Sequence, residues 1–274
     1  LPPWNCYRHA APKRSMSIRS VSKTSVKARV LSVFSACLKL PAIIRHCSVY
    51  PVRECVPTTA MWETAAKGAI TLEIGIHGIP VTMQQSVYDE LAYGALYNYQ
   101  YQNDDNRNYS YYKRVFVGAL RAVDFITSLP QYNGKALGVT GSSQGGALSM
   151  VTAALDKRVT FYAAIHPAMC DHRAHLQKVA GGWPHYFYYF PTPTPQRIQT
   201  ADYYDMVNFA RRITVPGWFS WGYNDDVCPP TSTYAAYNSI TAPKELHPYL
   251  ETGHYWYQEQ YEQWSQWLWA QMGL

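Results

Sequence analysis

The sequence predicts an α/β fold, a mostly parallel β-sheet flanked by helices. Short apolar segments with the length of buried strands alternate with longer segments whose apolar residues recur at helical spacing. The chain has 274 residues, of which 47% are hydrophobic, enough for one large core. No internal repeat divides it, so one domain is expected.

Each expected element rests on a local pattern. Apolar runs bounded by turn residues predict strands at residues 66–78, 136–140, 161–165, 215–222 and 245–250. Helical spacing of apolar residues predicts helices at residues 109–129, 147–155 and 255–272. The last of these carries Trp264, Trp267 and Leu268, and we expect it to pack on the sheet.

Ser143 is the candidate nucleophile. It stands in Gly-Ser-Ser-Gln-Gly-Gly, at residues 141–146, between an expected strand and an expected helix. This G-x-S-x-G order is typical of the nucleophile elbow of α/β-hydrolases, where small neighbours allow a strained turn that exposes the serine hydroxyl. The backbone N–H of Gln144, which follows the serine, is expected to be one oxyanion-hole donor.

A serine hydroxyl needs a base, and the base needs an acid that orients it. In α/β-hydrolases these follow the serine in the order acid, then histidine. Asp225, three residues past Gly222 at the end of an expected strand, is the predicted acid, with Asp226 as the fallback. His254, in the loop after the expected strand at 245–250, is the predicted base.

The remaining histidines of this part of the chain have no predicted catalytic role. His247 lies inside an expected strand and is interpreted as a packed or surface side chain. Five others could line the site but lack the chain order of a base: His77, His166, His172, His175 and His185. They form no metal-ligand spacing such as H-E-x-x-H, so no metal or organic cofactor is expected.

From about residue 65 to 268 the chain resembles the acetyl xylan esterase and cephalosporin C deacetylase group, carbohydrate esterase family seven. The similarity includes Gly-Val-Thr-Gly-Ser-Ser-Gln-Gly-Gly-Ala-Leu at residues 138–148 and, most diagnostically, Asp-Asp-Val-Cys-Pro-Pro at residues 225–230. The resemblance implies an α/β-hydrolase fold and a triad of Ser143, Asp225 and His254 that removes acetyl groups from sugars. It also implies assembly into a homo-oligomer, since members often form rings.

An aromatic, proline-rich segment at residues 172–195 is expected to cover the site or to form a packing or oligomer contact. Trp183 and Tyr186 within it are the candidate substrate-binding residues.

Residues 1–63 differ from the rest of the chain. They contain ten Lys or Arg and two acids, a formal charge of +8, whereas residues 64–274 carry −2. The segment has no aromatic stacking pattern or known motif, so nucleic-acid binding is not expected. Four of the six cysteines lie here without a zinc spacing, while Cys170 and Cys228 are interpreted as buried free thiols.

The atypical segment has three open interpretations: a shifted reading frame over residues 15–63, a disordered stretch, or a divergent extension. Reading the codons of residues 49–59 one base earlier can give a Gly-rich string like that of the family. The second oxyanion donor is expected in the loop after an early strand, within this segment, so the printed chain is predicted to be weakly active. The catalytic domain is assigned to residues 64–274.

The expected partner is an acetylated sugar or small acetyl ester. No apolar run reaches the roughly twenty residues of a membrane span. Leu1 in place of Met suggests a fragment, so the compartment stays open between bacterial cytoplasm and periplasm or exterior.

Two alternatives to the esterase function remain: a peptidase or acyl-peptide hydrolase of the same fold, and a sugar-binding relative with impaired catalysis.

Overall fold

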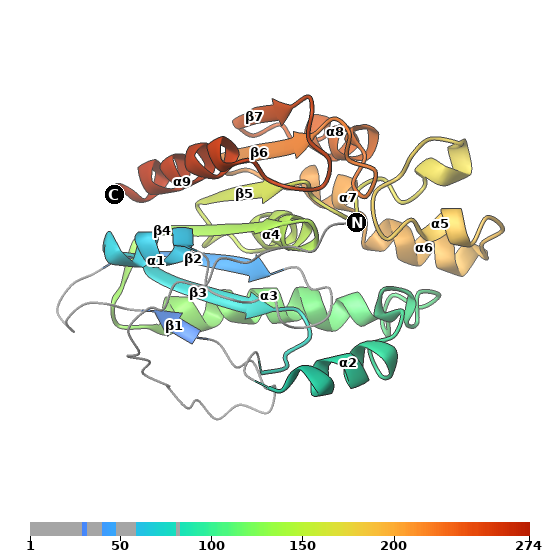
Figure 1. Ribbon diagram of the computed structural model, residues 1–274, viewed down its shortest axis with the longest axis horizontal. Coiled ribbons are helices and arrows are strands. Elements are labelled where there is room, and N and C mark those ends of the chain that lie inside the picture. Colours follow the sequence, from blue (N-terminus) through green and yellow to red (C-terminus); the bar gives the residue numbers. More distant parts are fainter. Residues whose placement is uncertain (1–28, 32–39, 48–58, 81–82) are drawn as a thin grey trace.

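The computed structural model describes residues 29–31, 40–47, 59–80 and 83–274. They form a seven-stranded sheet in the order β1-β3-β2-β4-β5-β6-β7, with helices on both faces (Figure 1). The six strands from β3 to β7 run parallel, and β1 pairs antiparallel with β3 at one edge. The predicted α/β fold with a mostly parallel sheet is confirmed.

The strands have the following bounds: β1 (Arg29–Leu31), β2 (Leu40–Cys47), β3 (Ile70–Gly75), β4 (Tyr132–Ser142), β5 (Phe161–Ile165), β6 (Gly217–Gly222) and β7 (Lys244–Tyr249). The α-helices are α1 (Thr59–Ala66), α2 (Gln85–Tyr93), α3 (Tyr111–Ser128), α4 (Gln144–Leu155), α5 (Tyr186–Tyr189), α6 (Pro195–Tyr203), α7 (Met206–Ala210), α8 (Pro230–Asn238) and α9 (Gln258–Met272). Two 3₁₀ turns complete the described elements, η1 (Tyr99–Tyr101) and η2 (Ala174–Gln177).

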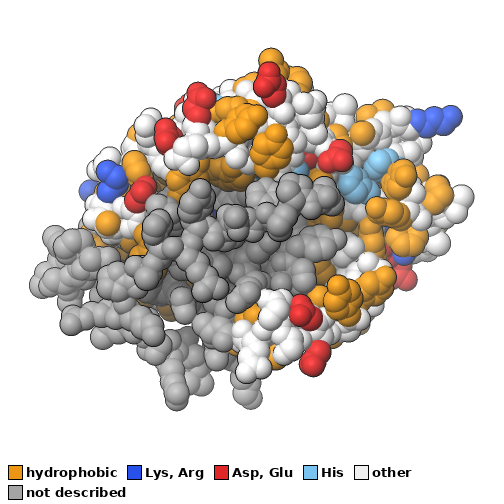
Figure 2. All heavy atoms as spheres, viewed as in Figure 1, with side chains coloured by type: hydrophobic (Ala, Val, Ile, Leu, Met, Phe, Trp, Pro, Cys, Tyr) orange, Lys and Arg blue, Asp and Glu red, His pale blue; other side chains and the backbone are white. Residues whose placement is uncertain are grey.

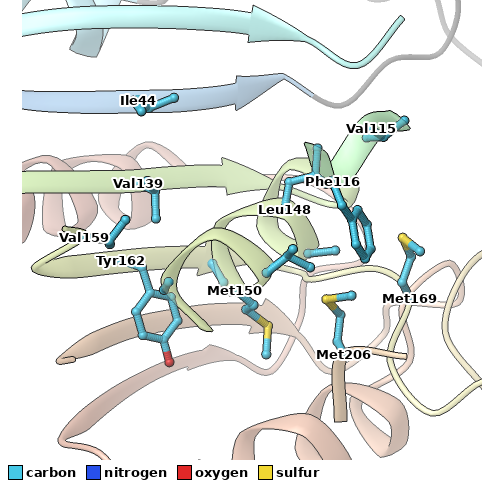
Figure 3. Packing of buried hydrophobic residues seen from close by; sticks show 14 of the residues in the cluster. Ile44, Val115, Phe116, Val139, Leu148, Met150, Val159, Tyr162, Met169 and Met206 are labelled. Carbon is cyan, nitrogen blue, oxygen red and sulfur yellow. The ribbon is translucent and has the colours of Figure 1, made fainter. Parts of the chain in front are cut away.

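The sheet separates two hydrophobic clusters. Helices α3, α4, α7 and α8 bury apolar side chains in the larger cluster, and Figure 3 shows Phe116, Met169 and Met206 gathered beside α4. Helices α1 and α9 cover the opposite face with a smaller cluster. Strand β5 contributes to both, because its side chains alternate: Tyr162 packs in the larger cluster and Phe161 in the smaller one.

Helix α3 shows why the sequence folds as predicted. Ser110 caps it by accepting a hydrogen bond from the N–H of Tyr112, which satisfies one of the first helical donors. Its buried residues, among them Val115, Val123 and Ile126, recur at helical spacing and face the larger cluster.

On the opposite face of the sheet, the indole N–H of Trp264 in α9 donates to Oγ1 of Thr140 in β4 over 2.9 Å. The predicted packing of the last helix on the sheet is confirmed.

The sheet includes strands from the segment before residue 64. Strand β2 lies between β3 and β4, with His46 paired to Gly141, so its carboxyl end adjoins the turn that carries Ser143. The second oxyanion donor was expected in the loop after an early strand. Residues 48–58, which follow β2, lie outside the described residues, as does most of the stretch interpreted as frame-shifted. Among the residues described, no helix has the length and apolar character needed to cross a membrane.

Candidate active site

Ser143 occupies a strained turn between β4 and α4. Its φ of 56° and ψ of −119° lie in a region that non-glycine residues rarely adopt. The turn is held on both sides: the N–H of Ser143 donates to the carbonyl of Ile165 at 2.8 Å, and its carbonyl accepts from Ala147 and Ala168. The predicted strand, turn and helix around this serine are therefore present.

The glycines around Ser143 allow close backbone contact. A Cβ added to Gly141 would lie 2.4 Å from the carbonyl carbon of Gly145, and one added to Gly146 would lie 2.9 Å from the carbonyl oxygen of Ile165. Both distances are shorter than real Cβ contacts, and the nearby atoms are backbone that cannot rotate away. The small residues of the motif are thus a packing requirement of the elbow.

Asp225 lies in the loop after β6, with a fully buried carboxylate. Its Oδ1 accepts hydrogen bonds from the N–H groups of Val227 and Cys228, at 2.9 and 2.7 Å. Its Oδ2 lies 2.8 Å from Nδ1 of His254. The neighbouring Asp226 is exposed. Of the two predicted acids, the structure pairs Asp225 with the predicted base.

His254 lies in the loop after β7, and 22% of its side-chain surface is exposed. Because the Asp225 carboxylate accepts a hydrogen bond from Nδ1–H, the neutral ring has its lone pair on Nε2. His247, by contrast, stacks on Trp218 with ring centroids 5.1 Å apart, as a packed residue of β7.

Cys228 links the serine to the acid. Its thiol is fully buried and lies within hydrogen-bonding reach of the Ser143 side chain, while its N–H donates to Asp225. Burial, together with the negative Asp225, raises the pKa of this thiol well above its usual range. The predicted assignment of Cys170 and Cys228 as buried free thiols is confirmed. Cys228 therefore lies near Ser143 and bonds through its N–H to the carboxylate that holds His254.

His166, one of the five histidines that were expected to be able to line the site, lies beside the candidate base, a contact that the sequence did not predict. Its ring centroid lies 5.1 Å from that of His254 and 6.1 Å from that of Trp256. It directly follows β5, at the same sheet edge as the loops after β6 and β7. That position, one residue past a predicted strand, was the sequence signal available for it.

Gln144 is the first residue of α4, so its N–H has no partner within the helix and is available at the positive end of the helix dipole. Its side-chain Nε2 donates to the hydroxyl of Tyr99. The Tyr99 ring lies 4.7 Å from His77 and 6.4 Å from Trp183, measured between centroids. The Gln144 side chain thus connects the elbow to a group of packed rings, those of Tyr99, His77 and Trp183.

The two predicted substrate contacts differ in their surroundings. Trp183 is half-buried, and its N–H donates to the carbonyl of Val227, two residues past Asp225. Tyr186 is only 3% exposed, its hydroxyl donates to the carbonyl of Gln100, and its ring packs on His172. This burial corrects the expectation for Tyr186, which packs within the protein and has no open face for a ligand.

The segment around α5 also has exposed aromatic side chains. Tyr188 and Tyr189 are 67% and 59% exposed, whereas Phe187 is buried. Figure 2 shows hydrophobic side chains gathered on the side of the molecule where Figure 1 places α5 and α6.

Among the described side chains, no group of three His, Cys, Asp or Glu residues is arranged to hold a metal ion.

The sheet order, the elbow on β4 and the residues beyond β6 and β7 define an α/β-hydrolase fold. The sequence model of the acetyl xylan esterase family matches residues 13–271, so the chain belongs to that family.

Individual relatives agree with this assignment. Acetyl esterase Axe7A of Xylanibacter ruminicola is 49% identical over 184 residues, which are 66% of this chain and 42% of that protein. The chain thus matches less than half the length of this curated relative.

Solved structures show the same fold. An acetyl xylan esterase from a Paenibacillus species superposes with a TM-score of 0.76 at 25% identity, covering 89% of this chain and 79% of the other. Acetyl xylan esterase 1 from a Thermoanaerobacterium species gives 0.75 at 23% identity, with 90% and 79% covered. The acylaminoacyl peptidase of Pyrococcus horikoshii gives 0.59 at 10% identity, with 84% and 35% covered, a likeness of fold alone.

Proposed function

We propose that the chain is a serine esterase that removes acetyl groups from an acetylated carbohydrate, such as acetylated xylan, or from a related small acetyl ester. The observation that supports it most is the buried Asp225 carboxylate 2.8 Å from Nδ1 of His254, together with a serine on a strained elbow that follows β4 of the same sheet. Membership in the acetyl xylan esterase family supports the acetyl substrate.

In the proposed reaction, the Ser143 oxygen attacks the acetyl carbonyl carbon while Nε2 of His254 takes the hydroxyl proton. Asp225 holds the imidazole in the tautomer with its proton on Nδ1 and stabilises the imidazolium that forms. The N–H of Gln144 donates to the developing oxyanion at the positive end of α4. His254 gives the proton to the departing sugar oxygen, which leaves as a hydroxyl group, and water then releases acetate from the acyl-enzyme by the same steps.

Trp183 is the proposed contact for the sugar that carries the acetyl group. It is partly exposed, and its backbone is tied to the loop of Asp225. Aromatic faces pack against the C–H faces of sugar rings, so this position suits the alcohol side of the ester.

The test is acetate release from acetylated xylo-oligosaccharide and from a chromogenic acetyl ester. Ser143→Ala should abolish both activities. Ser142→Ala is the matched control, because Ser142 precedes the nucleophile and accepts a hydrogen bond from the indole of Trp256 instead. It should retain activity within a few-fold.

Two other outcomes would redirect the proposal. Cleavage of acyl-peptides without acetate release would favour a peptidase of the same fold. Binding of the acetylated oligosaccharide with no turnover would favour an impaired sugar-binding relative.

A further inference from the structure

His166 combines three unusual properties. Its side chain is almost completely buried, and neither Nδ1 nor Nε2 has a hydrogen-bond partner among the described residues. Its backbone has a φ of 36°, a positive value that is rare outside glycine. Unpaired buried polar atoms and backbone strain both reduce stability, and both concentrate at functional sites.

The surroundings of His166 connect it to the candidate base. The N–H of His166 donates to the carbonyl of Ser220 in β6 at 2.8 Å, which fixes the backbone. Its ring lies against His254 with centroids 5.1 Å apart and an angle of 48° between the planes, and Trp256 meets it edge-on. Two imidazoles from different loops are therefore packed together, and the inner one is buried.

Burial holds the pKa of His166 well below its usual range, and the neighbouring His254 acts in the same direction. His166 is therefore neutral at ordinary pH. A neutral imidazole has a large dipole whose negative end is the nitrogen with the lone pair, so it stabilises a nearby cation that this nitrogen faces. A phenylalanine would fill the same space without unpaired nitrogens, so packing alone does not explain a histidine here.

We propose that His166 is a positioning residue for His254: its buried, unpartnered imidazole favours the protonated form of His254 while that ring holds the Ser143 proton. The inference rests on the proposed function. No proton passes to His166 itself, and its ring acts as a fixed dipole against the imidazolium, as preorganised groups do in other active sites.

Other groups act on the same charge. Asp225 bonds to Nδ1 of His254, and the N–H groups of Val227 and Cys228 donate to the other oxygen of the same carboxylate. The negative charges of Asp226 and Asp225 also interact with His185. These groups remain in place when His166 alone is replaced, so the change can be assigned to His166.

The experiment compares the chain with His166→Phe and His166→Leu, which fill the site without nitrogens, and with His166→Gln, which restores a polar side chain. The readouts are the melting temperature, kcat on an acetyl ester across pH, and the NMR titration of His254, assigned by the signal lost in His254→Gln. The titration works even on an inactive chain.

The apolar variants should melt at a higher temperature, because two unpaired buried nitrogens are gone. Their kcat should nevertheless fall about tenfold, and the midpoint of the His254 titration should move down by about one pH unit, since the same interaction supports both. His166→Gln should recover part of both.

Three results would overturn the proposal: an unchanged His254 titration in the apolar variants, kcat retained by His166→Phe, or a loss in His166→Gln as large as in His166→Phe. If one apolar variant fails to fold, the other decides. Absence of acetyl-ester hydrolysis in the unmodified chain would refute the proposed function, while a shifted His254 titration would still support the coupling of the two rings.

Discussion

Oδ2 of Asp225 and Nδ1 of His254 lie 2.8 Å apart, although 29 residues separate them in the chain. Two parallel neighbours, β6 and β7, end at the same edge of the sheet, so the loops that follow them meet. Two backbone N–H groups fix the other carboxylate oxygen, so the imidazole meets an acceptor that is already oriented.

Asp225→Asn should therefore lower kcat on an acetyl ester by about a thousandfold or more, as replacement of this acid does in serine hydrolases generally. An amide can donate to Nδ1 and so favours the tautomer whose Nε2 carries a proton and cannot act as a base. The measurement is the steady-state rate at neutral pH.

Asp226→Asn is the matched control, because Asp226 is the adjacent, exposed acid. It should stay within a few-fold of the unmodified chain. Equal losses in both variants would remove the reason for choosing Asp225 as the orienting acid.

Gly141→Ala should destabilise the chain by about 3 kcal/mol or more, because the added methyl group overpacks rigid backbone. The clash at 2.4 Å from Gly145 lies inside the elbow, so activity should fall with stability. Denaturant unfolding gives the free energy.

Gly118→Ala is the corresponding control within α3, where a Cβ would meet nothing within 4 Å. Alanine favours a helix interior, so this variant should gain about 0.5–1 kcal/mol. A Gly141→Ala chain as stable as Gly118→Ala would contradict the close packing of the elbow.

The regular elements could be predicted from sequence because their patterns are local. The strand predicted at residues 161–165 has the observed bounds of β5, and the helix predicted at 109–129 begins at Tyr111 because Ser110 caps it. The pairing of Asp225 with His254 could also be anticipated, because both follow expected strands in the order that the elbow requires.

The remaining contacts depend on distant parts of the chain. Tyr186 is buried because its hydroxyl meets the carbonyl of Gln100, 86 residues earlier. His166 contacts His254 because the sheet places the end of β5 near the loop after β7. Both contacts join residues that are far apart in the chain, so no local sequence pattern shows them. Residue polarity and chain order therefore could not predict the roles of Tyr186 and His166.

Asp205 makes stability depend on pH. Burial raises the pKa of its carboxyl to about 6, despite the lowering effect of hydrogen bonds from the N–H groups of Val207, His172 and Asp171. A folded-state pKa above the usual 3.8 means that the folded chain binds this proton more tightly than the unfolded chain. The stabilisation that comes from tighter proton binding at Asp205 is thus complete below pH 3.8 and is lost as the pH rises through 6.

Asp205→Asn removes this titration. Between pH 5 and pH 8 the free energy of unfolding of the unmodified chain should fall by about 1 kcal/mol more than that of the variant. Urea unfolding at the two pH values gives both differences. Asp89→Asn, at an exposed site in α2, serves as control, and it should follow the unmodified chain across this range. Parallel pH dependence of the unmodified chain and Asp205→Asn would contradict the raised pKa.

Trp183→Ala should separate sugar binding from ester chemistry. Losing one aromatic face costs about 0.5–1.5 kcal/mol, so KM for acetylated xylo-oligosaccharide should rise about two- to tenfold. KM for a small chromogenic acetyl ester should change little, because that substrate has no sugar to stack.

Tyr186→Phe is the matched control: it removes the hydroxyl that donates to Gln100 and should lower stability without changing KM for either substrate. A rise in KM with Tyr186→Phe, or equal rises for both substrates with Trp183→Ala, would remove Trp183 as the sugar contact.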